Sequence, residues 1–280
     1  GAMSVSGLRQ ILPAGDKASR ASVASAAPLP RARSTPWRAV LSLGLLVALW
    51  ALAAWAVNDP LRAPSPQAVF VELWRAWTEG KLPADLAATL WRVTLSFIIA
   101  MGFGGAIGIA LGLNARLDRW LDSWLTVALN VPALVVVVLC YLWIGLNETA
   151  AILAVALNKI PTVAVMLREG VRVLDPGLRD MARLYRMGPV KRLRHVILPQ
   201  LAPQILAAAR TGLSLIWKIV LVVEFLGRSN GIGFRIHLDF QMFDIPGVLA
   251  NALAFVAVML AVEWLLLAPL ARRALRWRTE

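Results

Sequence analysis

The chain has 280 residues, of which 59% are hydrophobic and 16% are charged, and its formal net charge is +13. A mean hydropathy of +0.68 places it among membrane proteins and excludes an ordinary soluble domain. A basic chain can bind nucleic acid, but here the basic residues alternate with apolar runs, which is typical of membrane topology.

The first 38 residues are expected to form a flexible cytoplasmic tail. Residues 1–3 resemble a scar left by tag cleavage and are set aside. Residues 4–36 are rich in Ala, Ser, Pro and Arg without an apolar period, which predicts disorder. No apolar core follows within a short basic start, so a cleavable signal peptide is not expected.

Residues 39–268 are predicted to form a transmembrane domain. Six apolar runs follow one another, each near the roughly 20 residues that cross a bilayer. Their expected bounds are Ala39–Val57, Ala87–Leu113, Trp120–Ile144, Thr149–Leu167, Ile205–Leu226 and Val248–Leu267. The predicted fold class is therefore all-α, a polytopic membrane protein with six transmembrane helices.

Lys and Arg gather in three places, the tail 1–38, the loop 168–199 and the tail 269–280. Six spans put all three on one side of the membrane, and the positive-inside rule makes that side cytoplasmic. We therefore expect a multi-pass protein whose N- and C-termini are both cytoplasmic.

The connection between the first two spans contains an amphipathic stretch. Pro66 can begin a helix there. We expect this helix to lie in the outer membrane interface, because aromatic residues are frequent at that depth. Its apolar side holds Val69, Phe70, Leu73, Trp74 and Trp77.

In the second span, small residues recur every four positions, at Ala100, Gly104, Gly108 and Gly112. This spacing lets two helices approach closely in lipid. The close contact can lie within the bundle or between two subunits, and both interpretations stay open here.

Ionisable residues inside apolar spans are costly, so they are candidates for a substrate pathway. Lys159 lies near the middle of the fourth span, and Lys218 lies in the fifth. The alternative is that each lysine forms a structural ion pair with Glu224 or Glu263, or extends to an interface. The candidate pathway residues are Asn130, Asn158, Lys159, Trp217, Lys218 and Glu224.

The loop 168–199 is the longest polar interval in the second half of the chain. Asp175 can cap a helix that begins at Pro176. Gly188 can end this helix, and Pro189 can begin a second, short and basic one. The pattern predicts a helix-turn-helix at the membrane surface. The first helix has one apolar face, formed by Leu178, Met181, Ala182 and Tyr185.

This loop resembles the E-A-A loop of permease subunits of bacterial ABC importers. Asp180-Met181-Ala182 stands at E-A-A, Val196 at the family Ile, and Leu198-Pro199 at Leu-Pro. Arg186 stands where the family has Gly, and we expect Gly188-Pro189 to supply the turn instead. The flanking EGVRVLDPGLRDMARLY and HVILPQLAP resemble the nitrate, sulfonate and taurine branch, and the resemblance covers roughly residues 65–270.

The resemblance implies a type I ABC importer permease fold and a homodimer in a bacterial inner membrane. It implies two ATPase subunits that bind ATP and Mg, a periplasmic binding protein and membrane lipid as partners, and no nucleic acid. It also implies that the loop couples ATP hydrolysis to transport. The coupling residues would be Asp180, Met181, Ala182, Tyr185, Arg186, Gly188, Leu198 and Pro199.

The sequence itself lacks the motifs of an energy-converting or metal-dependent enzyme. It has no GxxxxGK[ST] motif, and His195 and His237 stand apart from any ligand cluster. We expect no cofactor in this chain and no enzymatic activity. The favoured function is import of a small anion such as a sulfonate, taurine or nitrate. The alternatives are import of a neutral or cationic metabolite or vitamin precursor, a stand-alone secondary transporter or channel, and an intramembrane enzyme, which lacks a catalytic constellation.

Overall fold

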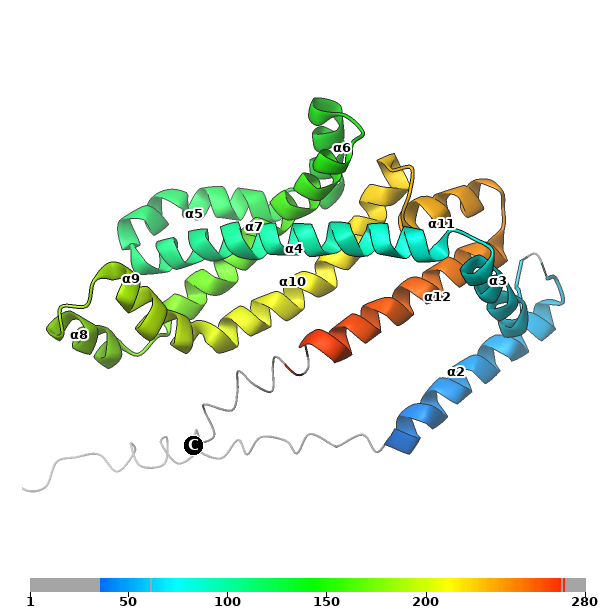
Figure 1. Ribbon diagram of the computed structural model, residues 1–280, viewed down its shortest axis with the longest axis horizontal. Helices are drawn as coiled ribbons and strands as arrows, with labels where there is room; N and C mark the ends of the chain where they lie inside the picture. Colours follow the sequence, from blue (N-terminus) through cyan, green and yellow to red (C-terminus); the bar gives the residue numbers. More distant parts are fainter. Residues whose placement is uncertain (1–35, 61, 268, 270–280) are drawn as a thin grey trace, which may run out of the picture. The chain divides into compact units, whose positions relative to one another are not determined.

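A computed structural model describes residues 36–60, 62–267 and 269, so most of the two predicted tails lies outside the described residues (Figure 1). Throughout these ranges every regular element is a helix, which confirms the all-α fold class. The chain divides into two compact units, one that ends at Leu49 within α2 and one that begins at Trp50.

The helices are α2 (Pro36–Val57), α3 (Pro66–Thr78), α4 (Leu82–Leu113), α5 (Ala115–Asn130), α6 (Ala133–Ile144), α7 (Glu148–Arg172), α8 (Pro176–Leu184), α9 (Pro189–Arg192), α10 (Leu198–Gly227), α11 (Ile232–Gln241) and α12 (Ile245–Val262), with π-helical turns η1 (Leu193–Ile197) and η2 (Glu263–Leu267).

Five helical segments are long and apolar enough to cross a membrane. They are Val40–Val57, Leu82–Leu113, Glu148–Arg172, Pro189–Gly227 and Ile245–Leu265. The helices α5 and α6 together make a sixth candidate, but they are bent by 92°.

The third predicted span, Trp120–Ile144, corresponds to this bent pair of helices. The bend falls at Val131 and Pro132, between α5 and α6. Pro132 has no backbone N–H, and its ring disfavours a helical conformation at the residue before it. Val131 accordingly adopts an extended backbone, with ψ at 122°.

The centre of the fold is the contact of α4 with α7, which lie side by side in Figure 1. A Cβ atom added to Gly108 would lie 2.4 Å from the carbonyl oxygen of Ala164, and one added to Gly104 would lie 2.8 Å from that of Ile160. The row of small residues thus packs inside the chain, and the intramolecular interpretation is confirmed.

The predicted amphipathic helix is present as α3. The Ser65 hydroxyl accepts a hydrogen bond from the Ala68 N–H at 3.3 Å and caps its N-terminus. Val69 is fully buried, whereas Phe70, Trp74 and Trp77 are exposed. Exposed aromatic side chains on a helix between two spans are typical of a membrane interface.

The close α4–α7 contact predicts that Gly108→Val lowers the stability of the protein in detergent by about 1–3 kcal/mol, because overpacking forces the backbones apart. Gly102→Val is the matched control, since a Cβ at Gly102 meets no atom within 4 Å. Thermal unfolding of the two variants measures the difference. Equal melting temperatures would contradict the packing role of Gly108.

Candidate functional site

The loop 168–199 folds as the predicted helix-turn-helix, with α8 and α9 as its helices. The Asp175 side chain caps α8 by accepting the Gly177 N–H at 2.8 Å. α8 ends with two hydrogen bonds, from the Tyr185 N–H to the Met181 carbonyl and from the Met187 N–H to the Ala182 carbonyl, both at 3.0 Å. The second bond spans five residues, which is how a helix closes on a left-handed residue.

That left-handed residue is Arg186, whose φ is +49°. The expectation that Gly188 and Pro189 make the turn is therefore wrong. Gly188 has φ −62° and stands at the N-terminus of α9, where Pro189 takes the first helical position. The backbone at this position needs a positive φ, which the Gly of the family pattern would adopt at no steric cost.

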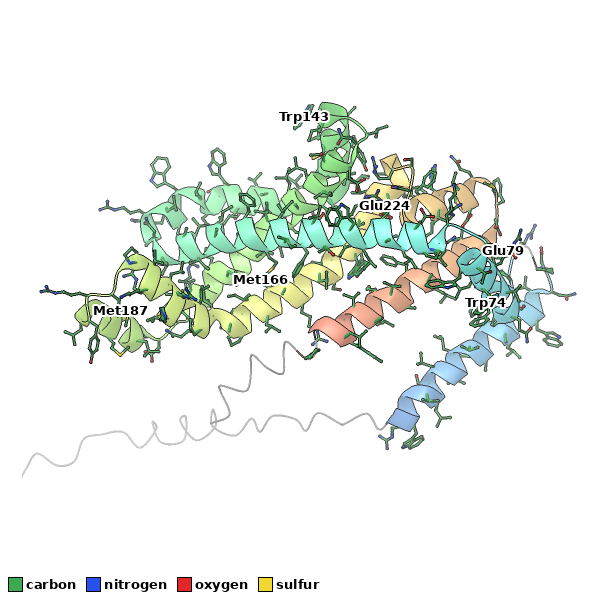
Figure 2. The ribbon with its side chains drawn as sticks, in the orientation of Figure 1. Trp74, Glu79, Trp143, Met166, Met187 and Glu224 are labelled. Carbon is green, nitrogen blue, oxygen red and sulfur yellow. The ribbon has the colours of Figure 1, made fainter. Side chains whose placement is uncertain are left out.

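The loop exposes apolar side chains. Ala182 is fully buried, but Leu184, Tyr185 and Val190 are more than two thirds exposed. A surface hollow of about 700 Å³ is lined by residues 185–191, including Met187, which Figure 2 labels. Asp180 and Pro199 are exposed, and Leu198 is half-buried in the first turn of α10. An exposed apolar surface of this kind is suited to a protein partner.

The base of the loop is fastened to the spanning helices. Val171, Leu174, Ile197 and Leu201 form one buried apolar cluster. The Gln200 side chain accepts the Asp175 N–H at 3.2 Å and donates to the Val196 carbonyl at 3.0 Å. Both ends of the loop are therefore fixed to each other and to α7 and α10.

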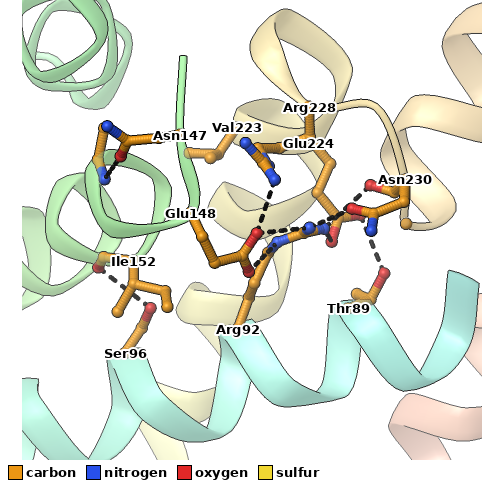
Figure 3. Close-up of polar contacts among 12 residues, drawn as sticks. Thr89, Arg92, Ser96, Asn147, Glu148, Ile152, Val223, Glu224, Arg228 and Asn230 are labelled. Carbon is orange, nitrogen blue, oxygen red and sulfur yellow. Dashed lines mark hydrogen bonds and ion pairs between the residues drawn. The ribbon is translucent and has the colours of Figure 1, made fainter. Parts of the chain in front are cut away.

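The opposite ends of α7 and α10 meet in a buried ion network, shown in Figure 3. Arg92 on α4 donates to Glu224 on α10 at 2.7 Å and to both carboxylate oxygens of Glu148 at 2.7 and 2.9 Å. Arg228 donates to Glu148 at 2.8 Å. Arg92 also binds the backbone and side-chain oxygens of Asn230. Two guanidinium groups and two carboxylates balance each other in this network.

The same network holds the segment Gly227–Phe234 in place. The N–H groups of Gly231, Ile232 and Gly233 donate to the side chains of Asp85, Thr89 and Glu224 at 2.8, 3.0 and 2.9 Å. Carboxylates of the chain itself thus occupy the positive N-terminus of α11. These donors are taken, so the segment is not an open anion cradle.

Lys159 is buried, with 8% of its surface exposed, and it forms no hydrogen bond or ion pair with any of the described residues. The expected partners are engaged elsewhere. Glu224 binds Arg92, and Glu263 accepts two hydrogen bonds from Arg210 at 2.8 and 3.0 Å. The structural ion pair considered for Lys159 is therefore wrong, because its acids are satisfied by arginines.

The other candidate pathway residues are placed differently from one another. Trp217 is 2% exposed and packs edge-on against Phe255 at 5.5 Å. Glu224 is fully buried. Both are enclosed within the subunit and do not line an open path. Of the remaining candidates, Lys218 and Asn130 are exposed and Asn158 is half-buried.

Arg92, Glu148 and Arg228 were not among the residues predicted from the sequence. Arg92 could have been found, since it lies inside the predicted second span and an intramembrane arginine requires a partner. Glu148 and Arg228 stand beside span ends, where charged residues are ordinary.

A polar cavity of about 410 Å³ opens between α3, α4, α11 and α12. Burial raises the pKa of Asp239 at its wall, although Asn251 donates a hydrogen bond to that carboxylate at 2.7 Å. Acidic and basic side chains are mixed around the cavity, so its charge selects neither anions nor cations. The charged lining residues are Glu72, Arg75, Glu79, Lys81, Arg235, Asp239 and Asp244.

Residues 82–273 match the family described as the binding-protein-dependent transport system inner membrane component. The chain belongs to this family.

Curated relatives agree with this membership. The permease is 33% identical over 248 residues to SsuC of Escherichia coli (strain K12), named as an aliphatic sulfonates transport permease protein, covering 88% of this chain and 92% of that one. It is 30% identical over 249 residues to the taurine transport system permease protein TauC of the same organism, covering 86% and 90%. It is 29% identical over 258 residues to the riboflavin transport system permease protein RibX of Chloroflexus aurantiacus, covering 90% and 96%.

A solved structure supports the fold. A chain of the MetNI methionine ABC transporter, in an inward-facing conformation, superposes on the permease with a TM-score of 0.57 at 18% identity. The match covers 67% of this chain and 94% of that chain. The permease therefore has the type I ABC importer permease fold.

The buried ion network predicts that Arg92→Ala destabilises the permease by about 3–5 kcal/mol, because it leaves the fully buried Glu224 carboxylate without its cation, whereas Glu148 keeps Arg228. Arg62→Ala is the control, since Arg62 pairs with Asp59 at 84% exposure of its side chain and an exposed pair contributes about 0–1 kcal/mol. The measurement is the melting temperature in detergent. A loss no larger than that of Arg62→Ala would contradict the network's structural role.

Proposed function

We propose that the permease imports a small organic anion of the sulfonate or taurine type, driven by ATPase subunits that dock on the loop 168–199. The observation that carries this proposal is the loop itself, a fastened lever with an exposed apolar surface. Leu184, Tyr185 and Val190 are exposed there although they are apolar. A partner protein that covered them would gain the free energy of their burial.

The ATPase subunits would supply the energy, since the chain has no nucleotide-binding motif. Two of them, binding ATP and Mg, would each hold one loop of a permease homodimer. A periplasmic binding protein would deliver the solute at the opposite face. In this arrangement the permease lies in the bacterial inner membrane, with both tails and the loop in the cytoplasm. The excess of Lys and Arg in those three places supports this orientation.

Lys159 supports the choice of an anion. A buried ammonium without an ion pair is costly, and it persists where it serves a polar path or a passing ligand. Two copies of the permease would place two such cations along one pathway and would favour an anion over a cation. The names of SsuC and TauC agree with this solute class.

The alternative is a neutral metabolite or vitamin precursor, which the similarity to the riboflavin permease RibX favours. The two solute classes differ in their need for Lys159. An uncharged solute gains little from two cations, whereas a sulfonate depends on them.

Lys159→Gln should reduce taurine or alkanesulfonate uptake at least tenfold while the complex with the ATPase assembles normally. Its melting temperature should stay the same or rise, because a buried unpaired charge is removed. Uptake of radiolabelled solute into proteoliposomes with the cognate ATPase and binding protein is the measurement. Undiminished uptake would remove Lys159 from the pathway.

Gly188→Trp should block ATPase docking without unfolding the permease. A Cβ at Gly188 meets no atom within 4 Å, and its φ of −62° suits any residue, so the new indole extends into solvent. We expect reduced co-purification of the ATPase and loss of uptake, with an unchanged melting temperature. Gly188→Ala is the matched control and should behave like the wild type. Normal co-purification of the Trp variant would place the docking surface elsewhere.

A further inference from the structure

The helix α5 has little apolar attachment to the rest of the permease. It contains no buried residue, and its half-buried side chains form one narrow stripe. The stripe consists of Asp118, Leu121, Leu125 and Ala128. Trp120 and Trp124 point away from this stripe and are more than 70% exposed. Polar contacts must therefore account for much of what holds α5 in place.

Those contacts come from the last two turns of α7. The Arg168 guanidinium donates to Asp118 at 3.1 Å and to Asp122 at 2.6 Å, bridging one turn of α5. Arg172 forms a second ion pair with Asp118. Glu169 accepts from Arg168 at 3.1 Å and from Arg172 at 2.8 Å, which orients both guanidinium groups.

The Arg168 pair is shielded from water. Its side chain is 10% exposed and that of Asp118 is 13% exposed. At such burial the attraction between the charges is stronger than at an open surface, and removal of one partner is costly. The pair is thus rigid enough to transmit displacement.

The last turn of α7 is also the beginning of the loop 168–199. Val171 and Leu174 belong to the apolar cluster that also holds Ile197 and Leu201 at the start of α10. A displacement of the loop therefore displaces the turn of α7 that carries Arg168 and Arg172. The two arginines face α5, which continues through the 92° bend into α6.

We propose that Arg168 and Arg172 are positioning residues that make α5 move with the loop 168–199 when the ATPase closes. The inference rests on the proposed role of this loop in energy coupling. A topology signal needs only positive charge, which lysine also supplies. Binding two carboxylates one turn apart needs the planar fork of a guanidinium.

The test uses the complete importer in proteoliposomes, with its ATPase and binding protein, and measures solute transported per ATP hydrolysed. Arg168→Gln with Arg172→Gln should lower this ratio at least fivefold. Arg168→Lys keeps the positive charge, folds more readily and should lower it by a smaller factor. The exchanged pair Arg168→Asp with Asp122→Arg should recover part of the ratio lost in Arg168→Asp alone.

The matched control is Arg210→Gln, which breaks the 2.8 Å ion pair between Arg210 and Glu263, away from the loop. The control should keep the wild-type ratio. An unchanged ratio in the Arg168 and Arg172 variants would overturn the inference, as would an equal loss in the control. If the wild-type permease failed to bind the ATPase or to transport, the proposed function would fall first and the inference with it.

Discussion

A charge inside an apolar bundle is costly without a partner, and the end of this permease opposite the loop 168–199 depends on one close pair of charges. Arg92 and Glu224 meet at 2.7 Å, with exposed fractions of 2% and 0% for their side chains. Neither charge is tolerable alone, because burial without compensation costs several kcal/mol per ion. The pair draws Glu148, Arg228 and Asn230 around it, and so joins α4, α7, α10 and the segment before α11.

Between its two charged ends, the bundle is built on the packing of α4 against α7. In the middle, glycines let the two backbones approach too closely for a side chain. At the loop end, Arg168 and Arg172 of α7 form ion pairs with Asp118 of α5 and hold these two helices together. The helices α4 and α7 are thus closely packed, whereas α5 has no buried residue and is held by ion pairs to α7.

Two residues of this permease, Arg186 and Lys159, have an energetic cost that the fold must offset. Arg186, which stands where the family pattern has Gly, adopts a left-handed backbone at a steric cost of about 1–2 kcal/mol. The hydrogen bond from the Met187 N–H to the Ala182 carbonyl stabilises this conformation. Lys159 is a buried cation that is not bound by the acids Glu224 and Glu263, which bind arginines instead. Its cost to folding is the physical argument for a role in transport.

The sequence by itself determined the features that depend on neighbouring residues. Apolar length located the spans, the distribution of Lys and Arg predicted their orientation, and Asp175, Pro176 and Pro189 located the helices of the loop 168–199. The spacing of Gly104 and Gly108 predicted a close helix contact. All of these signals lie within a few residues of what they describe.

Only the tertiary structure decided the partners of the charges and the direction of the chain at two turns. Arg92 and Glu224 are 132 residues apart, and no local pattern connects them. The same holds for Arg210 and Glu263, which displaced the pairing considered for Lys159. The 92° bend between α5 and α6 also belongs to the tertiary structure, since both helices pack against α7. The left-handed turn fell at Arg186 because hydrogen bonding of the helix end, and not the position of the nearest glycine, determines where the backbone reverses.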